Sequence, residues 1–277
     1  MRFAKLHGAG NDFLLFDGRD DGALAAALPS QVRRLCDRRL GLGADGVLLL
    51  EPAGEREARL HYWNSDGSSA AFCANATRCA ARFAALRWGW RAMVLHTGYA
   101  AIPAELAGER VTLRLPPPTA LRPSAELLVD GEAISGRYLV VGVPHLVVRV
   151  DWPDFWRRRL DPLAPALRCH AALPEGGANV TFVRPETDGE LSARSWERGV
   201  EGETLSCGSG DAAAALVAAA EGWAAAPVRV RTASGRVLTV EPDGVPPECA
   251  CRFTGQAEWV ADGTLAAEWL AAGDPRA

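Results

Sequence analysis

The sequence predicts an α+β fold of two similar domains, each a mixed sheet folded around a central helix. Many short apolar segments, separated by Gly, Pro, Asn and Asp, surround only two long helix-forming segments, which is typical of α+β domains. The second half also repeats the first at a constant offset of 134 residues, the separation of Cys73 and Cys207. The corresponding pairs include Gly8 with Gly142, Asp17 with Asp151, Gly43 with Gly177, Asn11 with His145, Asp45 with Asn179 and Asn64 with Arg198. An ancient duplication explains this offset better than chance matching in an Ala-rich chain.

In the first half, strand patterns and turn residues predict the elements in order. Residues 2–17 alternate as strand, glycine turn and strand, and Ser30 can cap a helix that reaches about Leu40. The loop 41–46 then leads into a strand. The remaining elements are strands at 47–51 and 59–63, a long helix at about 74–88, and strands at 92–96, 100–106 and 110–115.

The second half is expected to repeat this order after a linker. Pro116-Pro117-Pro118 is the strongest linker signal, so the first domain is predicted at 1–117 and the second begins at 118. The expected elements are strands near 138–150, a helix near 154–160, strands at 179–184 and 190–196, a helix at 208–223, and strands at 228–232, 236–241 and 249–255.

Composition excludes several classes of function. The net charge of −4 gives no basic footprint for nucleic acid, and no apolar run approaches the length of a membrane span. The first residues lack the apolar core of a signal peptide, so a soluble cytoplasmic protein is expected. Seven cysteines in a long chain do not form a disulfide framework, and neither they nor the five histidines have the spacing of a metal site. The single lysine, Lys5, lies in a predicted strand, which argues against a pyridoxal phosphate Schiff base.

Two cysteines stand where their chemistry can matter. Cys73 and Cys207 each come immediately before a run of small, helix-forming residues. A helix N-terminus stabilises a thiolate through its dipole and its free N–H groups. Two such sites facing one cleft would place a proton acceptor and a proton donor on opposite sides of a bound molecule. Inverting a carbon centre requires that arrangement.

Eight stretches in order extend this hypothesis to nearly the whole chain. They are His7-Gly-Ala-Gly-Asn-Asp-Phe13, Gly41-Leu-Gly-Ala-Asp-Gly46, Asn64-Ser-Asp-Gly-Ser68, Cys73-Ala-Asn-Ala-Thr-Arg-Cys79, Gly142-Val-Pro-His145, Gly177-Ala-Asn179, Trp196-Glu-Arg-Gly199 and Glu203-Thr-Leu-Ser-Cys-Gly-Ser-Gly210. Together they resemble the diaminopimelate epimerase family. The resemblance implies two pseudo-symmetric domains with the active site in the cleft between them. It also implies that residues 261–277 return to the first domain, leaving 118–260 as the second.

The resemblance further implies the reaction and its residues. Family members interconvert LL-2,6-diaminopimelate and meso-diaminopimelate, in lysine and peptidoglycan precursor synthesis, without a cofactor or metal. In the LL-to-meso direction Cys207 is assigned as the proton acceptor and Cys73 as the donor. His145 and Glu197 are expected to tune the pKa values of the cysteines. The expected substrate-binding residues are Asn11, Asn64, Ala74, Asn75, Asn179, Glu197, Arg198, Gly208 and Ser209.

Three departures from the family pattern leave alternatives open. Ala74 replaces a glycine, Val143 replaces an asparagine that normally contacts substrate, and Ala261 lies where an aromatic dimer contact is often found. The partner is expected to be a small-molecule amino acid, and the resemblance allows a homodimer. The main alternative is a related cofactor-independent racemase of another amino acid. A thiol redox protein that pairs Cys73 with Cys207 and a non-catalytic binding protein are the remaining alternatives.

Overall fold

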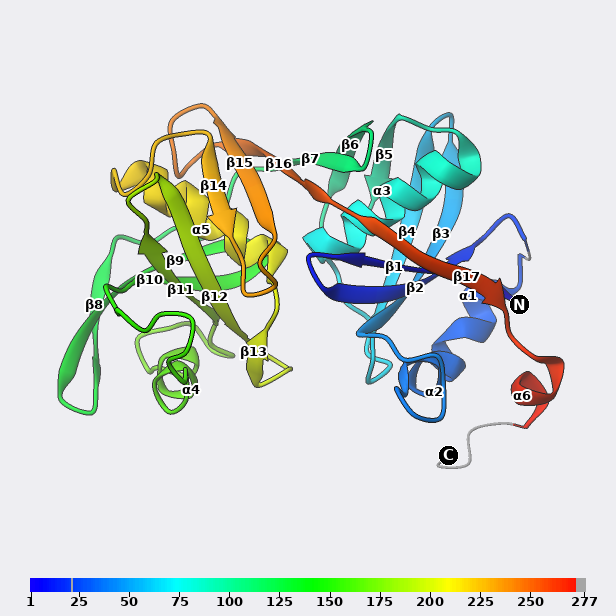
Figure 1. The fold of residues 1–277 in the computed structure, drawn as a ribbon, viewed down its shortest axis with the longest axis horizontal. Coiled ribbons are helices and arrows are strands. Elements are labelled where there is room, and N and C mark those ends of the chain that lie inside the picture. The colour runs from blue at the N-terminus through cyan, green and yellow to red at the C-terminus, as the bar shows by residue number, and fades with distance from the viewer. Residues whose placement is uncertain (21, 273–277) are drawn as a thin grey trace. The chain divides into compact units, whose positions relative to one another are not determined.

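The computed structural model describes residues 1–20 and 22–272 of the chain. It consists of two compact units (Figure 1). The N-unit comprises Met1–Leu113 together with the segment that starts at Gln256, and the C-unit comprises Arg114–Gly255. Domain boundaries at 117 and 260 remain a prediction. Among the described residues, no helix has both the length and the apolar character that crossing a membrane would require.

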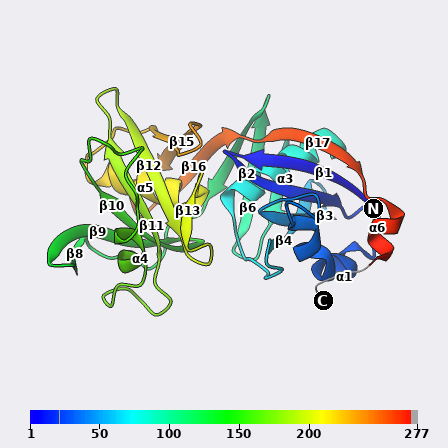
Figure 2. The same ribbon diagram turned by 60° about the horizontal axis from the view of Figure 1, so that its bottom comes forward.

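The N-unit is a mixed sheet around one long helix, α3 (Ala74–Trp88). The strands lie in the order β17-β1-β2-β3-β4-β5-β6-β7, and α3 contacts β1 to β6. The pairs β2–β3 and β4–β5 are parallel, and the other neighbouring strands are antiparallel. Their bounds are β1 Arg2–Gly8, β2 Asn11–Asp17, β3 Gly46–Gly54, β4 Glu57–Asn64, β5 Ala92–His96, β6 Ala101–Ala107, β7 Arg110–Leu115 and β17 Glu258–Thr264. Figure 2 shows β17 alongside β1 at the edge of this unit.

The C-unit has the same plan around α5 (Gly208–Ala220). Its strands lie in the order β8-β9-β10-β11-β12-β14-β15-β16, and α5 contacts β9, β10, β11, β12, β14 and β15. The parallel pairs β10–β11 and β12–β14 occupy the same places as those of the N-unit. The bounds are β8 Ala125–Val129, β9 Glu132–Val141, β10 Val143–Arg149, β11 Asn179–Pro185, β12 Glu190–Glu197, β13 Gly202–Thr204, β14 Val228–Arg231, β15 Val237–Asp243 and β16 Ala250–Gln256.

The matching strand orders confirm the predicted α+β fold and support a duplication. Gly43 and Gly177, which are 134 residues apart, both adopt the left-handed backbone region, with φ of 72° and 66°. A residue without Cβ adopts this conformation at little cost, so the same turn is built at the same place in each unit.

Small side chains let each sheet close around its helix. In α5, every residue from 208 to 218 is buried, and alanine is the commonest of them, at 212–215 and 218. Alanine is the best helix former and loses no side-chain entropy on burial, so such a helix can be covered on all sides. The apolar core continues outside the helix, around Leu14, Phe16 and Val47 in the N-unit and around Phe155, Val180 and Phe182 in the C-unit.

Two predicted helices were wrong. The segment from Ser30 to Leu40 is a 3₁₀ turn, η1 (Leu28–Gln31), followed by the short helix α2 (Val32–Cys36). The Ser30 hydroxyl does not cap a helix but donates to the Ala27 carbonyl at 2.9 Å. Asp37 ends α2 because its backbone is extended and its carboxylate accepts the N–H groups of Arg39 and Leu40.

The segment 154–160 forms turns, and the helix of that region is α4 (Leu163–Arg168) instead. The strand β8 was not predicted. The other short helices are α1 (Leu24–Ala27) in the N-unit and α6 (Ala267–Ala271) near the end of the described chain.

Candidate active site

Cys73 caps the N-terminus of α3. Its backbone is extended, with φ −149° and ψ 119°, and its Sγ accepts the Ala76 N–H at 3.5 Å. The Asn11 Oδ1 lies 3.7 Å from the same sulfur. Ala74 and Asn75 form the first turn, where helical geometry leaves backbone N–H groups without helical carbonyl partners. The N-unit thus gathers a thiol, an amide oxygen and a helix N-terminus around one point.

A chain of polar side chains continues behind Cys73. The Asn75 Nδ2 donates to Asn11 Oδ1 at 3.3 Å, and Arg78 Nη2 donates to Asn75 Oδ1 at 2.7 Å. On the other side, Asn11 Nδ2 donates to Asp45 Oδ2 at 2.7 Å. Gly8 makes room for the chain, because a Cβ there would lie 3.1 Å from Arg78 Nη2 and 3.2 Å from the Asn75 carbonyl oxygen.

Asn64 ends β4 and is fixed in a turn. Its side-chain Nδ2 donates to the Ser68 hydroxyl at 3.0 Å, and its backbone N–H donates to the Ser68 carbonyl at 2.9 Å. In the antiparallel ladder of β3 and β4 it pairs with Gly46, the first residue of β3. The side chain is therefore held at the strand end next to the loop that carries Asp45.

Cys207 occupies the matching position before α5. It is 5% exposed, and its Sγ lies 3.8 Å from the Ser209 hydroxyl. Burial raises the pKa of this thiol well above its ordinary value, and the carboxylates of Glu197 and Asp211 raise it further. The Gly210 N–H and the Ser209 hydroxyl oppose the rise. In this form of the protein Cys207 is therefore a thiol rather than a thiolate.

His145 lies on the other side of Ser209. Its Nε2 is 3.0 Å from Ser209 Oγ, and the side chain is completely buried. Burial lowers the pKa of His145 to about 3, with a smaller contribution from the positive charge of Arg198. The imidazole is consequently neutral near pH 7.

Three further predicted residues lie where β11 begins and β12 ends. Parallel pairing places Asn179 opposite His145, and Asn179 Oδ1 accepts the Arg198 backbone N–H at 2.7 Å. Glu197 ends β12, where its carboxylate accepts the Thr204 hydroxyl. The C-unit therefore brings Cys207, Ser209 and His145 together and holds Asn179 beside the backbone of Arg198.

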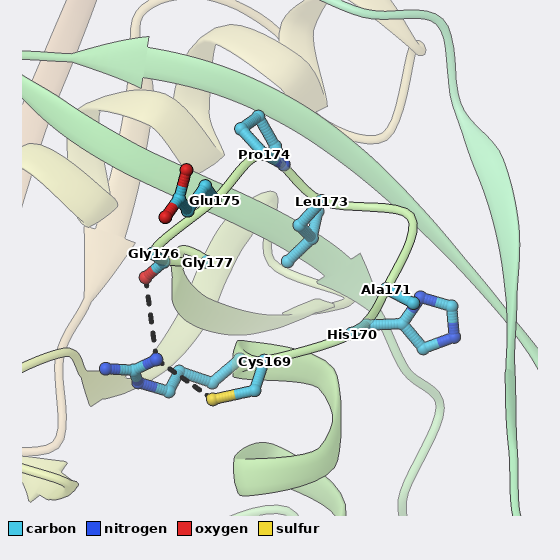
Figure 3. A pocket seen from close by; sticks show the side chains of 9 residues that line it. Cys169, His170, Ala171, Leu173, Pro174, Glu175, Gly176 and Gly177 are labelled. Carbon is cyan, nitrogen blue, oxygen red and sulfur yellow. Dashed lines mark hydrogen bonds between the residues drawn. The ribbon is translucent and has the colours of Figure 1, made fainter.

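The loop that follows α4 lines an open pocket of about 270 Å³ next to these residues (Figure 3). Arg168 Nη1 lies 2.9 Å from Cys169 Sγ and 3.5 Å from the Gly176 carbonyl oxygen. A Cβ added at Gly176 would be 3.4 Å from Arg198 Nη1, so the loop borders the Arg198 guanidinium. The pocket is lined by Arg168, Cys169, His170, Ala171, Leu173, Pro174, Glu175, Gly176 and Gly177.

Sequence reasoning missed several residues that shape the two half-sites. Thr181 packs so close to Gly210 that a Cβ on the glycine would lie 2.7 Å from its Oγ1 and 3.3 Å from Cys207 Sγ. Asp45 and Arg78 lie within motifs that carried the family resemblance, but nothing in the sequence indicated that both reach Asn11 or Asn75. Within residues 1–20 and 22–272, no three His, Cys, Asp or Glu side chains are grouped as metal ligands would be.

Comparisons with known proteins identify the family. The diaminopimelate epimerase profile matches residues 3–97 and 137–260. The diaminopimelate epimerase of Gemmatimonas aurantiaca is 39% identical over 258 residues, which cover 88% of this chain and 91% of the relative. That of Aquifex aeolicus is 39% identical over 255 residues, covering 87% and 90%. That of Archaeoglobus fulgidus is 36% identical and covers 96% of both chains.

Solved structures share the fold at lower identity. A hydroxyproline epimerase from Agrobacterium vitis superimposes with a TM-score of 0.72 at 18% identity, covering 100% of this chain and 94% of that one. A predicted epimerase from Pseudomonas aeruginosa gives a TM-score of 0.69 at 19% identity, covering 95% and 98%. These two likenesses concern the fold alone. On the profile match and the relatives at 36–39% identity, this chain belongs to the diaminopimelate epimerase family.

Proposed function

We propose that this protein is an isomerase that interconverts LL-2,6-diaminopimelate and meso-diaminopimelate, in lysine and peptidoglycan precursor synthesis. The observation that carries the proposal is the pair of matching cysteines, each before the central helix of its own unit, in a chain of this family. The relatives described above, which are named diaminopimelate epimerase, match this chain at 36–39% identity over most of both chains.

In the proposed reaction the two cysteines exchange one proton each with the α-carbon. In the LL-to-meso direction the Cys207 thiolate takes the α-proton, and the Cys73 thiol delivers a proton to the opposite face. The reverse direction exchanges the roles. The thiolate, not the thiol, is the base, so the raised pKa of Cys207 has to fall when substrate binds. A cationic α-ammonium group placed near Cys207 and Glu197 has the sign that this change requires.

Two helix N-termini are proposed to hold the α-carboxylate. The backbone N–H groups of Ala74, Asn75, Gly208 and Ser209 are first-turn donors, and donors of this kind stabilise negative charge that develops in a transition state. The distal head group needs a second set of polar partners. For it we propose the Arg198 guanidinium as a two-bond carboxylate ligand, with Asn11, Asn64, Asn179 and Glu197 as further substrate-binding side chains.

Val143 supports a second candidate, a racemase of another amino acid that uses the same two cysteines. It is the first residue of β10, two residues before His145, and it is partly exposed. A valine side chain cannot hydrogen-bond to a polar head group, so the recognition end of the site differs in chemistry from a site with asparagine there.

Deuterium incorporation from D₂O tests both candidates. Reduced protein is incubated in D₂O with LL-diaminopimelate and, separately, with single L-amino acids. Deuterium at the α-carbon together with meso product supports the epimerase, provided that both disappear in Cys73→Ala. Exchange confined to another amino acid replaces it with the second candidate. No exchange with any of them sinks both.

The proposed binding partner is a small-molecule amino acid, and neither nucleic acid nor a membrane enters the proposal. A homodimer and a cytoplasmic location remain predictions from the sequence. Light scattering of the purified protein measures the mass in solution and decides between monomer and dimer.

A further inference from the structure

Two amide side chains behind Cys73 are connected to a cation at one end and an anion at the other. The hydrogen bonds run from Arg78 to Asn75 at 2.7 Å, from Asn75 to Asn11 at 3.3 Å and from Asn11 to Asp45 at 2.7 Å. Asn75 and Arg78 are 1% and 0% exposed, so water does not compete for the bond between them. All four side chains belong to the N-unit.

The ends of this chain dictate which way both amides face. A guanidinium can only donate, so the Asn75 oxygen must face Arg78 and its NH₂ must face Asn11. An ionised carboxylate can only accept, so the Asn11 NH₂ must face Asp45 and its oxygen must face Asn75. Turning over either amide would set two donors or two acceptors against each other, which is costly. The two ends thus specify the same orientation together.

Cys73 lies at the oxygen side of Asn11, with its Sγ 3.7 Å from Oδ1. A thiol S–H can donate to that oxygen, whereas a thiolate would face its lone pairs. A hydrogen bond made only by the protonated form favours that form. The Ala76 N–H, 3.5 Å from the same sulfur, favours the thiolate by the same rule.

We propose that Asp45 is a positioning residue, which fixes the Asn11 amide with its oxygen toward Cys73 and so keeps Cys73 protonated as the donor thiol. Only the role of Cys73 as proton donor rests on the proposed function. The orientation of the Asn11 amide follows from contacts within the N-unit. Arg38 supports Asp45 from the solvent side, with Nη2 2.7 Å from Asp45 Oδ1, while Asp45 Oδ2 faces Asn11. Asp45 Oδ2 also accepts the Asp12 N–H at 3.2 Å, so both oxygens of the carboxylate are held in place.

The test is the pH dependence of Cys73 alkylation by iodoacetamide, read from the Cys73 peptide by mass spectrometry. Exposed Cys169 is first changed to serine to keep the reagent from being consumed there. Asp45→Asn keeps the size of the side chain but replaces one acceptor oxygen with an NH₂ group, which can donate toward Asn11. Without a fixed acceptor the Asn11 amide can turn its N–H toward the sulfur, at the cost of the 3.3 Å bond from Asn75, and we expect the pKa of Cys73 to fall by about one unit.

A double-variant cycle separates orientation from charge, because removing any nearby carboxylate lowers a thiol pKa. If Asp45 acts through Asn11, Asp45→Asn has no further effect on Cys73 in an Asn11→Ala background. An equal fall in both backgrounds, or no fall in the wild-type background, overturns the proposal. Asp45→Glu, which keeps an acceptor, is expected to restore the wild-type pKa.

The same variants have a kinetic signature. In the LL-to-meso direction, the limb of the kcat–pH profile that reports protonated Cys73 moves to lower pH in Asp45→Asn, by the same amount as the alkylation pKa. Alkylation needs no substrate. Failure of the wild-type protein to exchange α-protons would therefore remove the proposed function and leave the alkylation result to decide the orientation.

Discussion

At the scale of single residues, His145 is a neutral member of the polar cluster around Cys207 at neutral pH. His145 is completely buried, and burial holds its pKa at about 3. The neutral ring can share one hydrogen bond with Ser209, which in turn faces Cys207. The neutral His145 ring therefore adds no positive charge beside the Ser209 hydroxyl that faces the sulfur.

This burial makes stability depend on pH. In the unfolded chain His145 titrates near its ordinary pKa of 6.5, whereas in the folded protein it stays neutral until about pH 3. Because the pKa of His145 is lower in the folded protein, the contribution of this residue to the free energy of unfolding is fully present above pH 6.5. It is lost progressively as the pH falls from 6.5 to about 3. Between pH 6.5 and 5 the wild type should lose about 2 kcal/mol more of its free energy of unfolding than His145→Gln. Urea unfolding at several pH values measures the difference, and parallel curves for the two proteins would contradict it.

Gly210 is a second residue whose substitution has a clear direction. An alanine Cβ there would lie 2.7 Å from Thr181 Oγ1 and 3.3 Å from Cys207 Sγ. The hydroxyl of Thr181 is 3.0 Å from that of Ser195 in the core and has little room to move. We expect Gly210→Ala to cost about 1–3 kcal/mol of stability. A displaced sulfur should also lower kcat at least about tenfold.

Denaturation curves and epimerase assays measure both effects of Gly210→Ala. Gly22→Ala is the matched control, since nothing lies within 4 Å of a Cβ at that position. A Gly210→Ala protein with wild-type stability and turnover would show that the helix start is looser than the contacts indicate.

At the scale of elements, Cys73 is a helix cap as well as a proposed proton donor. Its sulfur accepts the Ala76 N–H at the start of α3, so loss of activity and loss of stability can be separated by substitution. The hydroxyl of serine can accept the same bond, whereas alanine cannot.

We therefore expect Cys73→Ala to lower the free energy of unfolding by about 0.5–1 kcal/mol and Cys73→Ser to retain it. Both should abolish α-proton exchange if the proposed function holds. Chemical denaturation of the three proteins compares the caps, and equal stability of the alanine and serine variants would argue against a capping role.

Element prediction succeeded where one signal dominated. The small-residue run after Cys73 predicted α3, which begins at Ala74 and ends before Gly89 in the left-handed region. It failed at Ser30 and at 154–160, where local and tertiary contacts decide the outcome. The Asp37 carboxylate binds two N–H groups beyond it and stops α2 after Cys36, a contact that periodicity alone does not reveal.

At the scale of the whole molecule, the sequence repeat corresponds to two units with the same order of strands. The offset could be recognised because backbone requirements preserve glycines such as Gly43 and Gly177. The polar side chains differ between the halves: the offset pairs Asn11 with His145 and Asp45 with Asn179. It therefore could not predict the hydrogen bonds that Asn11 makes with Asp45 and Asn75. The roles proposed for the site residues come from the family resemblance, whereas their contacts come only from the structure.

Because each unit has its own hydrophobic core, we expect a core substitution in one unit to destabilise mainly that unit. Phe182 is fully buried in the C-unit core, and Phe182→Ala should cost about 3–5 kcal/mol. Hydrogen exchange should quicken in the C-unit strands β10, β11 and β12 while β1, β2 and β3 stay protected. Uniform acceleration over both units would mean that the chain unfolds as one cooperative body.

The return of the chain through β17 has a consequence for how the protein is made. β1 (Arg2–Gly8) pairs with β2 on one side and with β17 (Glu258–Thr264) on the other, so β1 is synthesised long before its second partner strand. The C-unit, Arg114–Gly255, is contiguous and can complete its sheet while β1 still presents an open edge. An open edge is a site where strands of other chains can add. The half of the protein that is translated first is therefore finished last, and during synthesis aggregation should start at β1.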